Sequence, residues 1–250
     1  MKSCKNLIYN SKACKLDVYL PDFSGFKTIL YFHGGGIEEG DKADPNVIEI
    51  GKRFVSLGYG FVSVNYRMYP KARFPDFLRD CAEATAYAQA HCKEWGGNGK
   101  LIVSGQSAGA WMALMLCMDT QWLREAGVDS NMIAEWLIDS AQTTSHFNVI
   151  KYERGENPNL QRIDGFSPQY FVGPETKFSR MLLIFYEKDM PCRPEQNRLF
   201  EKSIRLFNPS ADVTCVQLTG EHCHGSTTKE SDGEYAFVKA AIRWLDGRKI

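Results

Sequence analysis

Short apolar runs of strand length alternate along the chain with longer amphipathic stretches. Continuous apolar runs predict strands that are covered on both faces, as in a parallel sheet between two layers of helices. The predicted strands are residues 16–20, 28–32, 60–65, 101–103, 136–139, 181–186 and 213–218. The predicted helices are residues 46–57, 76–93, 108–118, 195–207 and 233–245. This alternation predicts an α/β fold, a doubly wound and mainly parallel sheet with helices on both faces.

One long segment, residues 142–179, interrupts the alternation. It mixes polar residues, glycine and proline with isolated aromatic side chains such as Phe147, Tyr152 and Phe166. A connection of this length inside a compact domain is usually functional or contains small elements of its own. We therefore expect a single domain over residues 1–250, with residues 142–179 as a candidate cap over the substrate pocket. A surface loop anchored by its aromatic side chains is the alternative.

Charge and hydropathy exclude several classes of partner. The 30 basic and 30 acidic side chains cancel, so the chain carries no electrostatic footprint for nucleic acid or an anionic membrane. No apolar run approaches the length of a membrane span, and the N-terminal residues lack the apolar core of a secretory signal. The expected partner is a small-molecule substrate, and the expected state is a monomer or a homodimer.

Eight cysteines are present, and most stand where a small buried apolar side chain is usual. Cys81, Cys92 and Cys117 lie in helix-like segments and Cys215 in a strand-like one. This setting predicts a reducing, cytoplasmic location. A zinc site built from His222, Cys223, His224 and Cys192 would lack the paired spacing typical of such sites, so we expect no metal and no cofactor.

The candidate chemistry centres on Gly105-Gln106-Ser107-Ala108-Gly109, a GxSxG pentapeptide. It follows a predicted strand and opens a predicted helix, which is the setting in which this motif places a serine on a sharp turn above a sheet. The glycines two residues before and after the serine leave the backbone room for that turn. Ser107 is therefore the predicted nucleophile.

A second glycine-rich element, His33-Gly34-Gly35-Gly36, follows the predicted strand 28–32. Acyl transfer through a serine needs preorganised N–H donors for the oxyanion of the tetrahedral intermediate. Glycines let the main chain approach a ligand closely, so we expect the N–H groups of Gly35, Gly36 and Ala108 to be these donors. Gly34 would shape the loop.

Together these motifs resemble the esterase/lipase group of α/β-hydrolases that carries an HGGG loop. This group includes hormone-sensitive-lipase-like, kynurenine-formamidase-like and small feruloyl-esterase-like branches. The matching segments are residues 33–36, 65–70 (NYRMYP), 105–109 and 224–226 (HGS). Where the lipase-like branch usually reads GDSAGG, this chain reads GQSAGA, closer to the GHSAGA of the formamidase and feruloyl-esterase branch. The resemblance implies the α/β-hydrolase fold and hydrolase chemistry.

The general base should be a histidine, because its side chain can accept the serine proton near neutral pH. The chain order Ser, Asp, His of the resembled fold directs attention to the region after the last predicted strand, where both His222 and His224 stand. Spacing alone does not separate them, and the HGS continuation favours His224. His224 is the predicted base.

The carboxylate that orients the base should follow the strand 181–186. Glu187 and Asp189 are both there, and the resembled families place the acid in a Gly-x-x-Asp-like turn. Residues 186–189 match this turn except that Tyr186 replaces the glycine, which favours Asp189. Asp139, at the end of the preceding strand, is a further candidate for the carboxylate. Its favoured role is to order the loop that leads into the segment 142–179.

The predicted function is a serine carboxylic-ester hydrolase that acts on short-chain or aryl esters through an acyl-enzyme. An arylformamidase uses the same machinery on an N-formyl amide and remains an alternative. A non-catalytic ligand-binding protein of the same fold is a more remote one. The residues expected to bind the substrate are Gly34, Gln106, His146 and Phe147.

Overall fold

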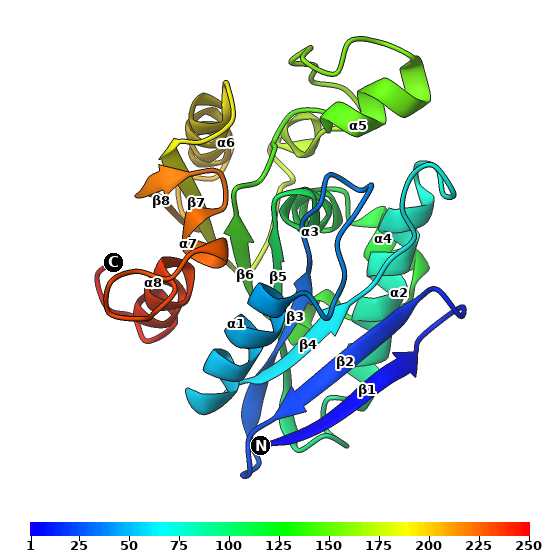
Figure 1. Cartoon of the computed structure of the whole chain (residues 1–250). Coiled ribbons are helices and arrows are strands. Elements are labelled where there is room, and N and C mark those ends of the chain that lie inside the picture. Colours follow the sequence, from blue (N-terminus) through cyan, green and yellow to red (C-terminus); the bar gives the residue numbers. More distant parts are fainter.

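An eight-stranded sheet runs through the centre of the computed structural model, which describes residues 1–250 (Figure 1). The strands are β1 (Lys2–Ile8), β2 (Lys15–Leu20), β3 (Phe26–Phe32), β4 (Gly60–Val64), β5 (Gly97–Gln106), β6 (Ile133–Asp139), β7 (Arg180–Lys188) and β8 (Asp212–Glu221). Their order in the sheet is β1-β2-β4-β3-β5-β6-β7-β8. Strand β2 is antiparallel to both of its neighbours, and all other pairs are parallel. The predicted fold class is confirmed.

Helices cover both faces of the sheet, and the sheet divides the hydrophobic core in two. The main helices are α1 (Pro45–Ser56), α2 (Asp76–His91), α3 (Ala108–Met118), α4 (Gln121–Glu125), α6 (Arg193–Phe207), α7 (His224–Thr227) and α8 (Ala236–Leu245). A core cluster of 43 buried residues includes side chains of α2, α3, α4 and α6, and a second cluster of 19 includes those of α1 and α8. Neighbouring residues of a strand point to opposite clusters, for example Leu30 to the larger and Ile29 to the smaller.

All seven predicted strands and all five predicted helices are present, with shifted ends. The prediction missed β1, an edge strand whose sequence, KSCKNLI, alternates weakly and leaves most of its side chains exposed. It also missed the short helices α4 and α7, which span fewer residues than the pattern of an amphipathic helix needs. No helix combines the length and the apolar character that a membrane crossing requires.

The segment 142–179 contains short elements of its own, α5 (Phe147–Val149), η2 (Ile150–Arg154) and η3 (Pro168–Phe171). In Figure 1 it lies beyond the carboxyl ends of β5 and β6. Aromatic contacts attach it to the loop after β4, because Tyr152 stacks on Tyr69 with ring centroids 4.3 Å apart and Phe166 meets Phe74 at 4.6 Å. The segment is therefore packed against the same edge of the sheet at which Ser107 stands.

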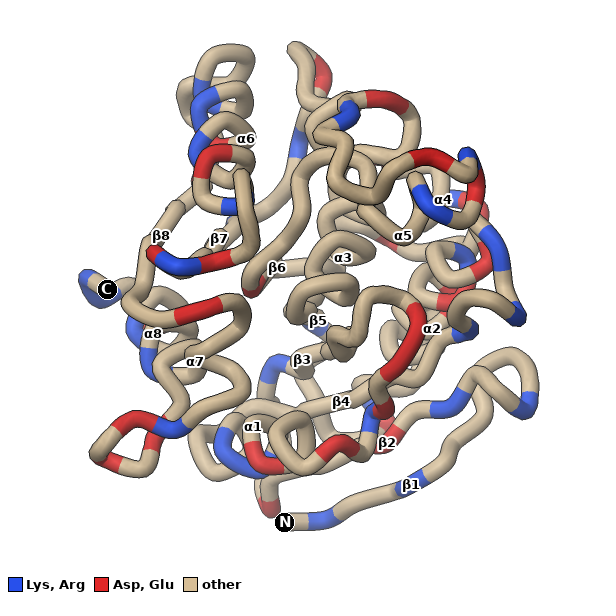
Figure 2. Tube along the Cα trace, turned by 45° about the horizontal axis from the view of Figure 1, so that its top comes forward, with Lys and Arg blue, Asp and Glu red and all other residues tan.

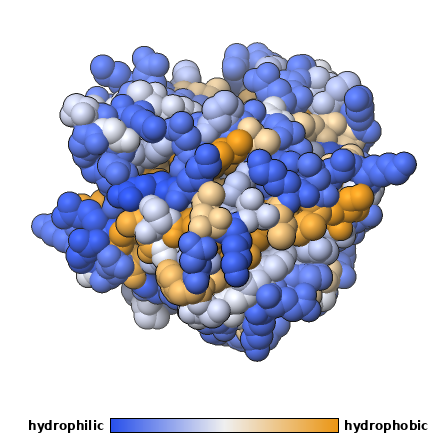
Figure 3. Space-filling model, turned by 60° about the horizontal axis from the view of Figure 1, so that its bottom comes forward, coloured by the Kyte–Doolittle hydropathy of each residue, from blue (hydrophilic) through white to orange (hydrophobic).

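The opposite, lower face of the molecule is mostly hydrophilic, and its apolar side chains form short bands between polar ones (Figure 3). Figure 2 shows acidic and basic residues interspersed along the chain, while helix α3 carries neither. The central position of α3 explains this composition, because all eleven of its residues are buried.

Candidate active site

Ser107 lies at the sharp turn between β5 and α3. Its backbone has φ 53° and ψ −114°, a region that residues with a side chain rarely adopt. Its N–H donates to the carbonyl oxygen of Asp139 on the neighbouring strand at 2.8 Å, which ties the turn to the end of β6. The turn therefore projects the hydroxyl of Ser107 above the carboxyl edge of the sheet.

The two flanking glycines of the pentapeptide are required by close packing of the backbone. A Cβ on Gly105 would collide with the carbonyl group of Gly109, and one on Gly109 would collide with the carbonyl oxygen of Phe32. Helix α3 therefore starts in direct contact with β3 and β5, and the two glycines give the backbone the room that the turn requires.

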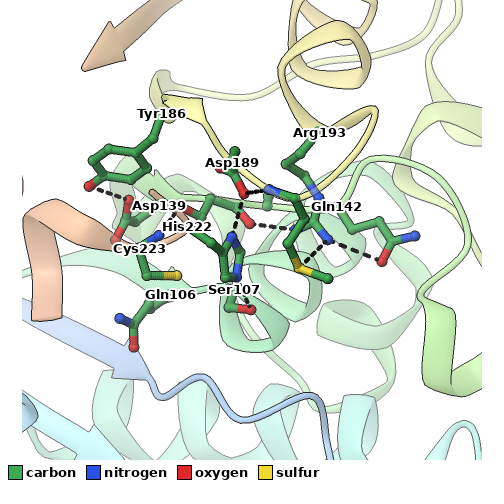
Figure 4. Close-up of polar contacts among 12 residues, drawn as sticks. Gln106, Ser107, Asp139, Gln142, Tyr186, Asp189, Arg193, His222 and Cys223 are labelled. Carbon is green, nitrogen blue, oxygen red and sulfur yellow. Dashed lines mark hydrogen bonds and ion pairs between the residues drawn. The ribbon is translucent and has the colours of Figure 1, made fainter. Parts of the chain in front are cut away.

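The hydroxyl of Ser107 belongs to a continuous hydrogen-bonded chain (Figure 4). Its Oγ lies 2.8 Å from Nε2 of His222, and Nδ1 of the same imidazole lies 2.5 Å from Oδ1 of Asp189. The Asp189 side chain is fully buried, and that of His222 is one quarter exposed. The arrangement can move a proton from the hydroxyl to the imidazole while the carboxylate faces the charge that forms.

The prediction that His224 is the base is wrong, because the imidazole that contacts Ser107 is that of His222. His222 lies between the end of β8 and α7 with its ring against Ser107, whereas His224 is the first residue of α7. The ring of His224 lies against Gly220, where an added Cβ would meet ring atoms of His224 within 3 Å. Cys223 separates the two histidines with φ 60°, and this left-handed residue turns the chain so that they face different directions.

The choice of Asp189 over Glu187 agrees with the geometry, since Asp189 contacts the imidazole and Glu187 is exposed. The N–H of Met190 donates to Oδ1 of Asp189 at 2.7 Å and fixes the carboxylate. A buried guanidinium, Arg193, stands nearby and donates to the carbonyl of Ser140 at 2.7 Å. Burial lowers the pKa of Arg193, and the charge of Asp189 opposes that change.

The HGGG loop lies beside Ser107. A Cβ on Gly34 would come within 3.4 Å of the Cβ of Ser107, so Gly34 makes close contact with the nucleophile. Gly35 and Gly36 have φ of 105° and 65°, and their N–H groups donate to no protein acceptor. Ala108 is the first residue of α3, where an N–H has no partner within the helix. All three predicted donors thus remain free for a ligand.

The start of this loop is fixed by His33. Its buried imidazole contacts the carbonyl of Gly34 through Nδ1 at 2.7 Å and stacks on Tyr66 with centroids 4.5 Å apart. The hydroxyl of Tyr66 donates to the carbonyl of His33 at 2.7 Å. Burial lowers the pKa of His33, which favours a neutral ring that donates from Nδ1 to the carbonyl.

The far end of the loop is held by the segment 142–179. Asn148 donates through Nδ2 to the carbonyl of Gly36 at 2.7 Å and to Glu38 at 2.9 Å. Lys151 and Tyr152 also contact the carboxylate of Glu38. Sequence reasoning missed Asn148, Glu38 and Arg193 because no motif marks them, and only the folded chain brings them to the site.

The four residues expected to bind the substrate have different positions. Gly34 borders Ser107, and the ring of Phe147 lies against Gly36. His146 is buried between Phe147 and Trp111, at centroid distances of 4.3 and 5.4 Å, and burial lowers its pKa well below the usual value. The amide of Gln106 donates to the hydroxyl of Ser226 at 2.8 Å, so this side chain is committed to the protein.

A polar hollow of about 380 Å³ opens beside Gly34, between the HGGG loop and the start of α1. Its lining includes His33, Gly35, Glu39, Asp44, Asn46 and Gln106. The HGGG loop therefore has this polar hollow on one side and the ring of Phe147 next to Gly36. No group of three or more His, Cys, Asp or Glu side chains is arranged to hold a metal.

Comparison with known proteins gives one family model and several relatives. The BD-FAE family model matches residues 16–151, which is more than half of the chain. This range includes the HGGG loop and Ser107 and ends before Asp189 and His222.

Two curated relatives are esterases by name. The esterase LipI of Mycobacterium tuberculosis is 33% identical over 97 residues, which cover 38% of this chain and 30% of LipI. The acetyl esterase of Salmonella choleraesuis is 28% identical over 120 residues, which cover 47% of this chain and 36% of that enzyme. The chain thus spans about a third of the length of these curated relatives.

Similar solved structures include esterase 2 of Thermogutta terrifontis phosphoramylated by tabun, with a TM-score of 0.79 and 18% identity. The match covers 98% of this chain and 94% of that one. Esterase B of Lactobacillus rhamnosis has a TM-score of 0.78 and 15% identity, with 98% and 84% coverage. These likenesses show that the chain has the α/β-hydrolase fold.

Proposed function

The chain belongs to the BD-FAE family, and from this premise we propose that it is a serine carboxylic-ester hydrolase acting on short-chain or aryl esters. The observation that carries the proposal is the hydrogen-bonded chain from Ser107 through His222 to Asp189. The Ser107 end of this chain lies beside a glycine loop in which the N–H groups of Gly35 and Gly36 are free. Nucleophile, base, orienting carboxylate and oxyanion donors are the four parts that acyl transfer through a serine requires.

In the proposed reaction, Oγ of Ser107 forms a bond to the ester carbonyl carbon while its proton passes to Nε2 of His222. The carbonyl electron pair moves to the oxygen, which the N–H groups of Gly35, Gly36 and Ala108 stabilise. Collapse of this intermediate breaks the bond to the alcohol oxygen, which takes the proton from His222. Water then attacks the acyl-enzyme in the same way, gives its proton to His222, and releases the acid with Ser107 restored.

The surroundings of Ser107 support a flat or short acyl group. Phe147 lies against Gly36 and restricts the space there, and its ring is backed by the buried rings of His146 and then Trp111. The polar hollow beside Gly34 suits a polar leaving alcohol. A structure of esterase 2 of Thermogutta terrifontis, which has the same fold, holds propionate, and this supports a short acyl group.

A hydrolysis panel tests the proposal directly. It comprises nitrophenyl esters of increasing chain length, a feruloyl ester and N-formylkynurenine, each with wild type and Ser107→Ala. We expect turnover of acetyl to butyryl or aryl esters, and a loss on the order of 10⁶ in kcat for Ser107→Ala. A variant that keeps a tenth of the wild-type rate would refute the role of Ser107. A higher kcat/KM for N-formylkynurenine than for every ester would make the protein an arylformamidase.

We further propose a reducing compartment such as the cytoplasm, because all eight cysteines are free thiols. Fractionation of the source cells should recover the protein with cytosolic markers, and recovery with secreted proteins would contradict this location.

A further inference from the structure

A buried carboxyl group with no part in the proposed reaction lies directly behind the nucleophile. Asp139 ends β6 and is fully buried. The hydroxyl of Tyr186 donates to Oδ1 of Asp139 at 3.0 Å (Figure 4), and the hydroxyl of Ser226 contacts Oδ2. Removing a carboxyl group from water is costly even when both of its oxygens accept hydrogen bonds, as they do here, so a role for Asp139 is worth seeking.

Ser226 connects Asp139 to two parts of the active site. It accepts a hydrogen bond from the amide of Gln106, the residue before the nucleophile, at 2.8 Å. Its Oγ also lies 3.1 Å from the carbonyl oxygen of Cys223, the residue after His222. One hydroxyl therefore joins the turn of Ser107, the end of β6 and the loop that carries the imidazole.

The backbone of the same region is strained and has to be held in place. Ser140 and Cys223 have φ of 57° and 60°, which costs free energy for residues other than glycine. The N–H of Cys223 donates to the hydroxyl of Ser140 at 3.1 Å, and the N–H of Ser107 donates to the carbonyl of Asp139 at 2.8 Å. Such a conformation stays populated only when the surrounding hydrogen bonds and packing hold it in place.

We propose that Asp139, acting through Ser226, is a positioning residue that holds the His222 loop against the turn carrying Ser107. The inference rests on the proposed function, since it states that this link maintains the distance between Oγ of Ser107 and Nε2 of His222. Asp139 does not touch the imidazole and takes no proton from it. Its effect is on alignment, where an error of about 1 Å can cost about 10² in rate.

The link is compatible with either protonation state of Asp139. Burial raises the pKa of this carboxyl to about 7, against the effect of its hydrogen bonds from Ser226 and Tyr186. An ionised Asp139 accepts from the hydroxyl of Ser226. A protonated one donates to that oxygen, and Ser226 then donates to the carbonyl of Cys223. The other titratable groups that face Asp139 are Tyr31 of β3, Cys223 and Asp189.

The test compares three variants of the whole chain on the best nitrophenyl ester. Ser226→Ala removes the link, and Asp139→Asn keeps it, because the amide can donate to Ser226 and its oxygen can accept from Tyr186. Thr85→Val is the control, since it removes another buried hydroxyl hydrogen bond, to the carbonyl of Cys81 in α2 at 2.8 Å. We expect kcat to fall about 10²-fold in Ser226→Ala with KM nearly unchanged. Asp139→Asn should lose far less, and Thr85→Val should keep the wild-type kcat.

A second measurement does not depend on turnover. Imidazole ¹H–¹⁵N spectra, with His222 assigned through His222→Gln, should show a shifted or broadened His222 signal in Ser226→Ala and an unaltered one in Thr85→Val. An unaltered His222 signal in Ser226→Ala, or a loss of kcat no larger than in the control, would overturn the inference. Full turnover by Ser107→Ala would instead refute the proposed function, and the His222 spectrum would still decide whether the link positions the loop.

Discussion

Ser107 occupies a backbone conformation that suits its chemistry better than its stability. With φ 53° and ψ −114°, it stands where glycine is favoured, although a side chain is needed for function. Conformations of this kind cost of order 1–3 kcal/mol and occur at sites where the surrounding structure enforces them. Here the enforcement comes from the close contact of Gly105 with Gly109 and from the hydrogen bond to Asp139.

This strain predicts a stability difference between two inactive variants. Ser107→Ala and Ser107→Gly both lack the hydroxyl, but only glycine relieves the backbone. The free energy of unfolding of Ser107→Gly should therefore be about 1 kcal/mol larger than that of Ser107→Ala. Urea denaturation of the two proteins measures the difference directly. Equal midpoints, or a more stable alanine variant, would show that the turn is not strained.

The two neighbouring histidines also make separable predictions at this scale. His222→Ala should lower kcat nearly as far as Ser107→Ala, because these groups act as a unit. His224→Ala should cost little activity, since its ring packs on Gly220 and contacts neither Ser107 nor Asp189. Steady-state kinetics on one nitrophenyl ester compare the two. The reverse ranking would return the role of base to His224.

At the scale of elements, the segment 142–179 supports the oxyanion loop. Asn148 on α5 holds the carbonyl of Gly36, and Glu38 next to it is held by three side chains of the same segment. Backbone donors stabilise an oxyanion only if they are fixed before the reaction begins. The segment can therefore influence the rate without touching the substrate.

Asn148→Ala tests this coupling. Loss of the hydrogen bond to the half-buried carbonyl of Gly36 should lower kcat on the order of tenfold, because one hydrogen bond contributes about 0.5–1.5 kcal/mol and its loss loosens the loop. Asn159→Ala, in an exposed part of the same segment, is the matched control and should leave kcat unchanged. A normal kcat for Asn148→Ala would mean that the HGGG loop is held by His33 and Tyr66 alone.

At the scale of the whole molecule, the parallel strands bring distant residues to one edge of the sheet. Ser107 and His222 are 115 positions apart, and Asp189 comes from a third strand. Basic and acidic residues are equal in number and are interspersed along the chain trace in Figure 2. The stability of the molecule nevertheless depends on buried charge near the site.

We expect Asp139 to contribute to the pH dependence of the free energy of unfolding. Its pKa is raised from 3.8 to about 7 by burial, so the folded protein binds a proton that the unfolded chain releases between these values. The contribution of Asp139 to stability is then greatest below pH 4 and is lost as the pH rises towards 7. Compared with Asp139→Asn, wild type should lose on the order of 1–4 kcal/mol over this range. Denaturation at pH 5 and pH 8 measures the difference, and parallel pH dependences would contradict it.

The sequence by itself determined the fold class and the positions of seven strands, and it singled out Ser107 as the candidate nucleophile. These follow from local information, because apolar runs define buried strands and the glycines of the pentapeptide are needed within a few residues of Ser107. The oxyanion donors could be proposed for the same reason. Asp189 could be chosen because it follows a parallel strand that ends at the same edge of the sheet as Ser107.

Only the tertiary structure decided between His222 and His224. Two residues of sequence do not fix a direction, whereas the left-handed backbone of Cys223 points one imidazole to Ser107 and the other to Gly220. The same holds for Asp139, Ser226 and Asn148, whose long-range partners lie between 47 and 120 positions away. Contacts over such separations depend on how the sheet stacks its strands, and no local pattern along the chain records that order.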